Sequence, residues 1–367
     1  MKNLAWSARL PAVRGGLLAL LAAALFGIST PLVQLAGQGM GPFSTAALLY
    51  AGAAAVGLLS RQPAGREARL RRHDLPRLLA MAACGAVLGP VALAWGLQNT
   101  SGTSASLMLT LEALFTAVLA WLLYHETMDR RVWAAMALLL AGGLLLVIDQ
   151  GLQAGAGDAG LWGLLAVLLA TAAWGVDNTL SRALAERDPG QVVLAKALLG
   201  ASATGLLAWL AAEPLPGMAA AAALLAIGAS GYGLSLRFYL LAQRAFGAAR
   251  TGSVFAFAPF IGAGLALALG ERAASGWMAL GCVLMLAGVL LHLAESHAHE
   301  HTHEALEHEH AHRHDDGHHD HPHDDLHASG HAAAGPSGMG EHSHWHRHAP
   351  VTHSHAHVPD AHHTHRH

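Results

Sequence analysis

Ten long apolar stretches run along the chain, and each is long enough to cross a lipid bilayer. They cover residues 15–36, 42–60, 75–97, 102–124, 131–149, 161–182, 190–211, 218–241, 250–269 and 275–293. About 20 apolar residues span the hydrocarbon core as a helix, and a helix satisfies its backbone polar groups within the segment. We therefore predict an all-α integral membrane protein with ten transmembrane helices.

The apolar pattern repeats at an interval of about 146 residues. Residues 138–142 (LLLAG) recur as 284–288 (LMLAG), and residues 26–30 (FGIST) recur as 174–178 (WGVDN). Each half then holds five helices, an odd number, so the second half enters the membrane upside down relative to the first. Inverted repeats are typical of secondary transporters, whose substrate site lies between the halves near the bilayer midplane.

Basic residues predict the orientation. With the N-terminus inside, the cytoplasmic segments hold nearly all of the arginines, whereas the outer loops hold Arg272 alone. The positive-inside rule favours this arrangement, so we expect both termini on the cytoplasmic side of a bacterial inner membrane. The predicted parts are a cytoplasmic N-terminus (1–14), two five-helix repeats (15–149 and 161–293), an external linker (150–160) and a tail (294–367).

Composition narrows the class of protein. The 367 residues are 53% hydrophobic and 12% charged, with a mean hydropathy of +0.38, whereas soluble domains carry about 25% charged residues. Cys84 and Cys282 lie inside apolar runs without metal or redox spacing. The sequence has no nucleophile–base spacing, phosphate loop or HExxH motif. We expect no enzyme, no required cofactor and no nucleic-acid partner, but a lipid bilayer and a small-molecule or ion substrate.

Three segments of the first half carry a family resemblance: 104–117 (SASLMLTLEALFTA), 121–126 (WLLYHE) and 141–143 (AGG). In these the chain resembles the drug/metabolite transporter superfamily, EamA type, and its tail resembles a branch with histidine-rich tails. The resemblance implies two five-helix repeats and transport of small metabolites such as amino acids, nucleotide sugars or drugs. His125 departs from the family's usual Gly before Glu126, and Ala113 follows Glu112 in place of the usual Pro.

Ionisable residues inside spans are candidates for a substrate or coupling site, because a charge in lipid is costly. Glu112 lies in the middle of the fourth span, where a buried carboxyl could exchange a proton with a coupling gradient. A structural hydrogen bond to a neighbouring helix would explain it as well. Asp177 and Asn178, beside Trp174 in the sixth span, suit a polar or cationic ligand. Alternatively, Asp177 pairs with a basic side chain near the cytoplasmic end.

Two basic residues and one tyrosine complete the candidates. Lys196 in the seventh span either extends its ammonium group to the cytoplasmic face or neutralises Asp177, Glu112 or a substrate carboxylate. Arg237 in the eighth span has the same two interpretations, and Tyr232 is a candidate hydrogen-bonding residue of a substrate site, although ordinary interhelical bonds would explain it too.

Histidine dominates the tail. Of 28 histidines, only His73, His125 and His292 precede residue 295. The tail cannot bury a core, so we predict disorder. Alternating His-x-His places imidazoles on one side of an extended chain, and neutral imidazole binds Zn²⁺, Ni²⁺, Co²⁺ and Cu²⁺. The predicted metal ligands are His297, His299, His301, His303, His308, His310, His312, His314, His342, His344, His346, His348, His353, His355 and His357.

Three functions fit these observations. The first is a secondary transporter that exports a small metabolite and whose tail binds or senses divalent metal. The second is an exporter of Ni²⁺, Co²⁺ or Zn²⁺ whose tail passes ions to Glu112 and Asp177, although the spans hold few imidazole ligands. The third is a membrane-anchored metal sensor without transport, against which the buried charges and the glycine-rich helices argue.

Overall fold

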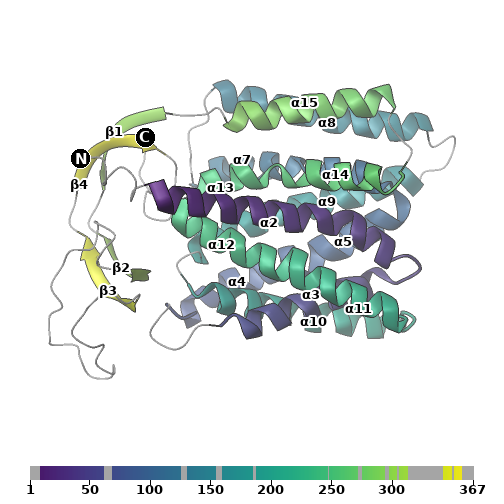
Figure 1. The fold of residues 1–367 in the computed structure, drawn as a ribbon, viewed down its shortest axis with the longest axis horizontal. Coiled ribbons are helices and arrows are strands. Elements are labelled where there is room, and N and C mark those ends of the chain that lie inside the picture. Colours follow the sequence, from purple (N-terminus) through teal and green to yellow (C-terminus); the bar gives the residue numbers. More distant parts are fainter. Residues whose placement is uncertain are drawn as a thin grey trace.

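The computed structural model is a bundle of long helices with a small group of strands beyond one end (Figure 1). It describes residues 9–61, 68–124, 130–153, 159–184, 187–246, 248–271, 275–293, 297–303, 306–312, 342–348 and 351–357. Among these residues, nine helices are long and apolar enough to cross a bilayer. The tenth predicted span is α15 (Gly276–Leu293), which is apolar but shorter. The predicted helical membrane fold is therefore confirmed.

Each predicted span appears within a few residues of its expected bounds. The first half contains α2 (Arg9–Ala36), α3 (Pro42–Leu59), the turn η1 (Arg72–Asp74), α4 (Leu75–Met81), η2 (Ala82–Leu88), α5 (Gly89–Asn99), α6 (Gly102–Met108), α7 (Leu111–Tyr124) and α8 (Arg130–Gln153). The second half contains α9 (Ala159–Ser181), η3 (Arg182–Leu184), α10 (Pro189–Leu210), α11 (Met218–Ile227), η4 (Gly228–Leu234), α12 (Ser235–Phe246), α13 (Ala248–Phe255), α14 (Ala258–Ala268) and α15.

The irregular parts of the helices repeat with the sequence. The third and eighth spans each contain a seven-residue π-helical segment, η2 and η4, and these begin 146 residues apart at Ala82 and Gly228. The fourth and ninth spans are both broken, after Met108 and after Phe255. Pro259, which has no N–H to donate, lies in the first turn of α14 and accounts for the second break. By contrast, α2 runs on through Pro31.

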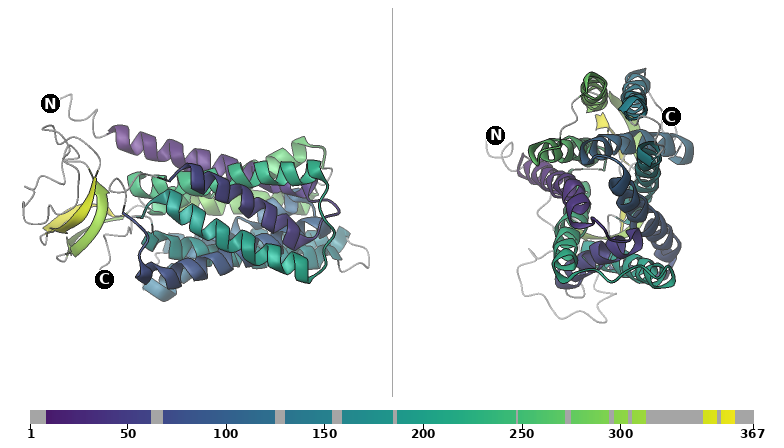
Figure 2. Two further views of the ribbon diagram at one scale, coloured as in Figure 1. Left: turned by 90° about the horizontal axis from the view of Figure 1, so that it is seen from below. Right: turned by 90° about the vertical axis from the view of Figure 1, so that its right-hand side faces the viewer.

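Helix packing follows an inverted two-fold relation. Helix α3 packs against its counterpart α10, and α8 packs against its counterpart α15 at the edge of the bundle (Figure 2). Helix α5 of the third span packs on α9, just as α12 of the eighth span packs on α2. Reciprocal pairing of this kind is what two oppositely inserted five-helix repeats produce, so the predicted inverted repeat is confirmed.

Glycines let the two halves approach closely. A Cβ atom at Gly52 of α3 would lie 2.0 Å from the carbonyl oxygen of Leu225, and one at Gly228 of η4 would lie 1.9 Å from that of Leu49. Small residues at membrane helix interfaces permit such close contacts. In lipid, where the hydrophobic effect does not drive helices together, van der Waals packing of this kind stabilises their association. The α3 backbone therefore lies directly against the eighth span.

Four strands follow the bundle: β1 (His297–His303), β2 (Leu306–His312), β3 (His342–His348) and β4 (Val351–His357). Strand β1 pairs antiparallel with β4, and β2 with β3. The tail thus differs from the predicted disorder in these segments, because their two-residue alternation is also the period of a strand, which pairs through its backbone without needing a core. His314 lies outside the described residues.

Replacing Gly52 with Ala should destabilise the bundle, because the new methyl group would overlap the Leu225 carbonyl. Overpacking of this kind costs about 1–3 kcal/mol. The matched control is Gly205→Ala in α10, where no atom lies within 4 Å of the new Cβ and the better helix former should be neutral or stabilising. Thermal unfolding of the detergent-solubilised proteins would show the difference; equal melting temperatures for both variants would contradict this packing.

Candidate functional site

A buried ion pair joins α9 to α10. The ammonium group of Lys196 donates to Oδ2 of Asp177, and the two side chains are only 4% and 6% exposed. Of the two interpretations of Lys196, the structure therefore favours the one in which it neutralises an acid. Removing two charges from water is expensive, and the pair persists because each partner compensates the other.

A second polar contact extends this pair toward α7. The side-chain amide of Asn178 donates to Oε1 of Glu112. Glu112 lies in the first turn of α7, directly beyond the break in the fourth span, where the positive end of the helix dipole favours a carboxylate. Because Asp177 and Asn178 are neighbours on α9, Lys196, Asp177, Asn178 and Glu112 form one polar row across three helices.

The π-helical segment η2 lies against this row at Gly85. A Cβ atom there would lie 2.2 Å from Oδ2 of Asp177, so only glycine permits this approach. The Gly85 carbonyl accepts hydrogen bonds from the Tyr50 hydroxyl and from Nε1 of Trp174, the latter at 3.0 Å. Oδ1 of Asp177 has no hydrogen-bond partner among the described residues. The row therefore contains a buried acceptor that a bound molecule could use.

Aromatic rings from both halves pack beside the row. The ring of Phe26 lies 5.4 Å from that of Trp174 and 5.9 Å from that of Tyr232, in edge-to-face arrangements. Tyr50 lies 5.6 Å from Tyr232. Phe26 and Trp174 occupy matching positions in the two repeats. Edge-to-face pairs stabilise beyond simple burial, and here they form a rigid apolar wall next to the charged groups.

The structure brings together all of the sequence-derived site candidates except one. Glu112, Asp177, Asn178 and Lys196 form the row, and Trp174 and Tyr232 belong to the aromatic wall. Arg237 lies elsewhere. Its guanidinium donates to the carbonyl oxygen of Ser60 at 2.8 Å, at the C-terminal end of α3. The negative end of the helix dipole favours a cation there. Sequence reasoning missed Tyr50 because a tyrosine in an apolar span is ordinarily a core residue.

Carboxylates tie the two halves together at the end of the bundle where α2 ends. Glu213 accepts from the N–H groups of Phe43 and Ser44 at 3.1 and 2.7 Å, at the start of α3. Glu271 accepts from the first two N–H groups of α6, at 2.7 and 2.8 Å. The first N–H groups of a helix lack partners within the helix, so these caps satisfy donors that lipid would leave unpaired.

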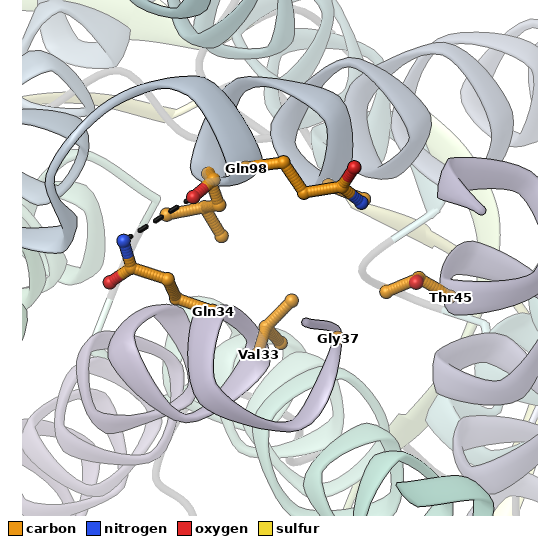
Figure 3. A pocket seen from close by; sticks show the side chains of 7 residues that line it. Val33, Gln34, Gly37, Thr45 and Gln98 are labelled. Atoms are coloured by element: carbon orange, nitrogen blue, oxygen red, sulfur yellow. Dashed lines mark hydrogen bonds between the residues drawn. The ribbon is translucent and has the colours of Figure 1, made fainter. Parts of the chain in front are cut away.

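A small cavity lies close to these caps (Figure 3). Its volume is about 10 Å³, room for about one water molecule. Nε2 of Gln34 on its wall donates to the carbonyl oxygens of Leu97 and Thr100 at 3.3 and 3.1 Å. The other lining residues are Val33, Gly37, Thr45, Ala94, Leu97 and Gln98. The cavity is too small for a metabolite.

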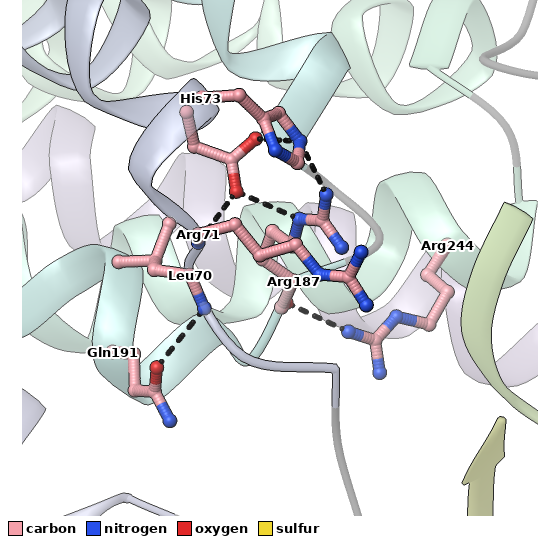
Figure 4. A network of polar contacts seen from close by, with 7 residues as sticks. Leu70, Arg71, His73, Arg187, Gln191 and Arg244 are labelled. Atoms are coloured by element: carbon pink, nitrogen blue, oxygen red, sulfur yellow. Dashed lines mark hydrogen bonds and ion pairs between the residues drawn. The ribbon is translucent and has the colours of Figure 1, made fainter. Parts of the chain in front are cut away.

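A network of charged residues ties the opposite end (Figure 4). Nε of Arg187 lies 3.0 Å from Oδ2 of Asp74, and its Nη2 lies 3.1 Å from Nε2 of His73. Arg244 donates to the Arg187 carbonyl oxygen at 3.0 Å. The network joins the segment before α4 to the segment before α10, one in each half. Sequence reasoning counted these arginines only for orientation, because their partner Asp74 is distant in the sequence.

The predicted metal ligands lie apart from the polar row of Lys196, Asp177, Asn178 and Glu112. All of them other than His314 lie on strands β1 to β4. Within the helices that the structure describes, no three His, Cys, Asp or Glu side chains form a group that could hold a metal ion.

Known proteins resemble this chain over the bundle. Residues 13–148 and 161–294 each match the EamA-like transporter family. An uncharacterized transporter of Methanothermobacter thermautotrophicus is 27% identical over 235 residues, which are 61% of this chain and 66% of that protein. The chain thus aligns with just under two thirds of this relative. A crystal structure of another protein, 21% identical, matches 76% of this chain and 94% of its own with a TM-score of 0.55, which supports the fold.

Replacing Asp177 with Asn should destabilise the protein strongly, because it leaves the Lys196 ammonium buried without a counter-charge. Removing one partner of a buried pair costs about 3–5 kcal/mol. The double variant Asp177→Asn with Lys196→Gln should recover most of this loss. A double-mutant cycle on melting temperatures measures the coupling; additive losses would show that the two side chains do not depend on each other.

Proposed function

Because the chain belongs to the EamA-like transporter family, we propose that it is a secondary active exporter of a small polar metabolite. The observation that carries the proposal is the polar row of Lys196, Asp177, Asn178 and Glu112, which contains the buried Lys196–Asp177 pair and lies where the two halves meet beside the aromatic wall. Membrane transport of a small substrate follows from the family. The export direction, the site and the role of the tail are the parts proposed.

The polar row has the chemistry of a substrate site. Lys196 and Asp177 compensate each other while the site is empty, so neither of these two charges is left unpaired. A substrate that carries a charged or hydrogen-bonding group can exchange with either partner, and Oδ1 of Asp177 is a further acceptor. The neighbouring rings supply apolar surface. Sites of this kind, with few polar groups on an apolar wall, are typical for small molecules.

Glu112 is the proposed proton carrier. Glu112 as a residue is half-buried, and its carboxyl contacts Asn178, which follows Asp177 directly on α9. A carboxyl that becomes charged beside the ion pair changes the balance of charge around the substrate. Loading or releasing one proton at Glu112 would therefore change the affinity of the row for a polar substrate, which is how transport couples to a gradient.

Alternating access requires one end of the bundle to open while the other stays closed. The charged network around Arg187 and Asp74 and the helix caps of Glu213 and Glu271 connect the halves at opposite ends. Both kinds of tie consist of ion pairs or hydrogen bonds near helix ends, which water can replace when an end opens. We propose that they break in turn during transport.

The tail is proposed to bind divalent metal on the cytoplasmic side and to regulate the transporter. Its histidines supply the neutral nitrogen ligands that Zn²⁺, Ni²⁺, Co²⁺ and Cu²⁺ prefer. The tail strands lie beyond the end of the bundle at which α2 begins (Figure 1), and the positive-inside rule assigns that end to the cytoplasm.

Replacing Glu112 with Gln should abolish proton coupling and leave substrate exchange intact, because Gln keeps the shape but cannot titrate. Proteoliposomes containing a pH-sensitive dye would be tested against amino acids, nucleotide sugars and organic cations. Asp149→Asn is the matched control, a carboxyl-to-amide change at a residue that accepts from Ser275 and lies outside the polar row, and should keep coupling. An unchanged pH dependence in the Glu112 variant would reject its role.

Truncation after Leu293 should leave metabolite flux in place and remove its response to Zn²⁺, because the metal ligands are lost and the bundle is not. Flux would be compared in oriented vesicles with Zn²⁺ added on either side. A response only from the tail side supports the orientation, and a response from the other side contradicts it. Zn²⁺ flux that survives truncation would instead indicate a metal exporter, and absence of any flux would indicate a sensor.

A further inference from the structure

The backbone register of the tail sets histidine opposite histidine. In the sheet of β1 and β4, His297 is paired with His357, and histidine is also paired with histidine two and four residues further along β1. We call each such pair of opposite residues a rung. In the sheet of β2 and β3, three further rungs have histidine on both strands. The remaining His–His rungs are His299 with His355, His301 with His353, His308 with His346, His310 with His344, and His312 with His342.

The sequence itself matches this register. Histidines occupy odd-numbered positions in β1 and β4 and even-numbered positions in β2 and β3. The histidines change from odd to even positions between β1 and β2, and from even back to odd positions between β3 and β4. Each of these two gaps is two residues long. Because the two changes lie at corresponding places in the paired strands, histidine is paired with histidine in both sheets. Metal binding by one strand at a time would not require this correspondence.

Neighbouring rungs have the spacing of a metal site. Directly opposite residues of an antiparallel pair have Cβ atoms about 4.5–5.5 Å apart. The next rung on the same face lies about 6.8 Å further along, two residues at about 3.4 Å each. Two successive rungs therefore gather four histidine positions on one face. Zn²⁺ binds imidazole nitrogen and is almost always four-coordinate in structural sites, so four histidine positions are enough for one ion.

We propose that the β1–β4 and β2–β3 pairs are two interstrand sites, each binding a divalent cation such as Zn²⁺ between histidines of opposite strands. This rests on the proposed metal binding by the tail and specifies its geometry. A two-stranded sheet is marginally stable in water, so a cation that joins both strands supplies the stabilisation that the ladder lacks. Metal binding then joins strands that are far apart in the sequence, and metal concentration becomes a folding signal for the tail.

The first test separates interstrand sites from binding by single strands. Full-length protein in lipid nanodiscs would be titrated with Zn²⁺ by calorimetry. One variant carries Gln at His353, His355 and His357 of β4, a second carries Gln at His297, His299 and His301 of β1, and a third carries all six changes; the matched control carries Gln at His362, His363 and His365, beyond β4. Each single-strand variant should lose the same tight site and at least tenfold in affinity, so the combined variant should lose no further site, whereas the control should stay within about twofold. Losses that add in the combined variant, or equal changes in the β4 variant and the control, would overturn the proposal.

The second test measures the register directly. Nitroxide labels would be attached at Ala298→Cys with Ala356→Cys, which face each other, after Cys84 and Cys282 are replaced by Ala. An off-register pair, Ala298→Cys with Thr352→Cys, is the control. With Zn²⁺ the facing pair should give a narrow distance distribution, shorter than that of the control pair. An unchanged, broad distribution would contradict the ladder.

The outcomes distinguish the two levels of the argument. If wild-type protein binds no Zn²⁺ at all, the proposed metal role of the tail fails, and the ladder fails with it. If Zn²⁺ binds but the β4 variant behaves like its control, only the interstrand sites are excluded and metal binding by the tail stands.

Discussion

Lipid supplies no water to a buried polar group, and this constraint organises the centre of the protein. Lys196 can remain in the seventh span because Asp177 compensates its charge, and Glu112 can remain in the fourth because it accepts from Asn178 at the start of a helix. Gly85 allows the backbone of η2 to approach Asp177. Each of these positions depends on its neighbours, because an unpaired charge in this medium is far more costly than in water.

The two halves share a backbone plan but differ in chemistry at the centre. Gly85 faces Asp177, and at the corresponding place of the other half a Cβ at Gly231 would lie 2.4 Å from the Cβ of Ser29. One half thus presents a carboxylate where the other presents a hydroxyl. Close glycine packing is retained at both places, whereas only the place at Gly85 has the carboxylate of Asp177 and its partner Lys196. An inverted repeat of this kind can keep its mechanical symmetry while its site becomes asymmetric.

The tail follows different physical rules from the bundle. Two-stranded backbone pairing alone gives little stability in water, and the sequence of the tail offers few apolar residues for a core. What it offers is a dense and regular array of nitrogen ligands. The bundle depends on excluding water from a few charges, and in our proposal the order of the tail depends on a cation that joins its strands. On that proposal, one chain combines a lipid-solvated transporter with a segment whose order depends on metal.

Sequence by itself determined the spans, their number and the inverted repeat, because hydrophobic length and period are local properties that lipid enforces on each segment separately. It also indicated Glu112, Asp177 and Lys196, since any charge within a span is conspicuous. Only the tertiary structure decided that Lys196 pairs with Asp177, that Tyr50 and Gly85 contribute to the row, and that Arg237 caps a distant helix. Those contacts join residues far apart in the chain, and their distances depend on how whole helices cross, which no local pattern specifies.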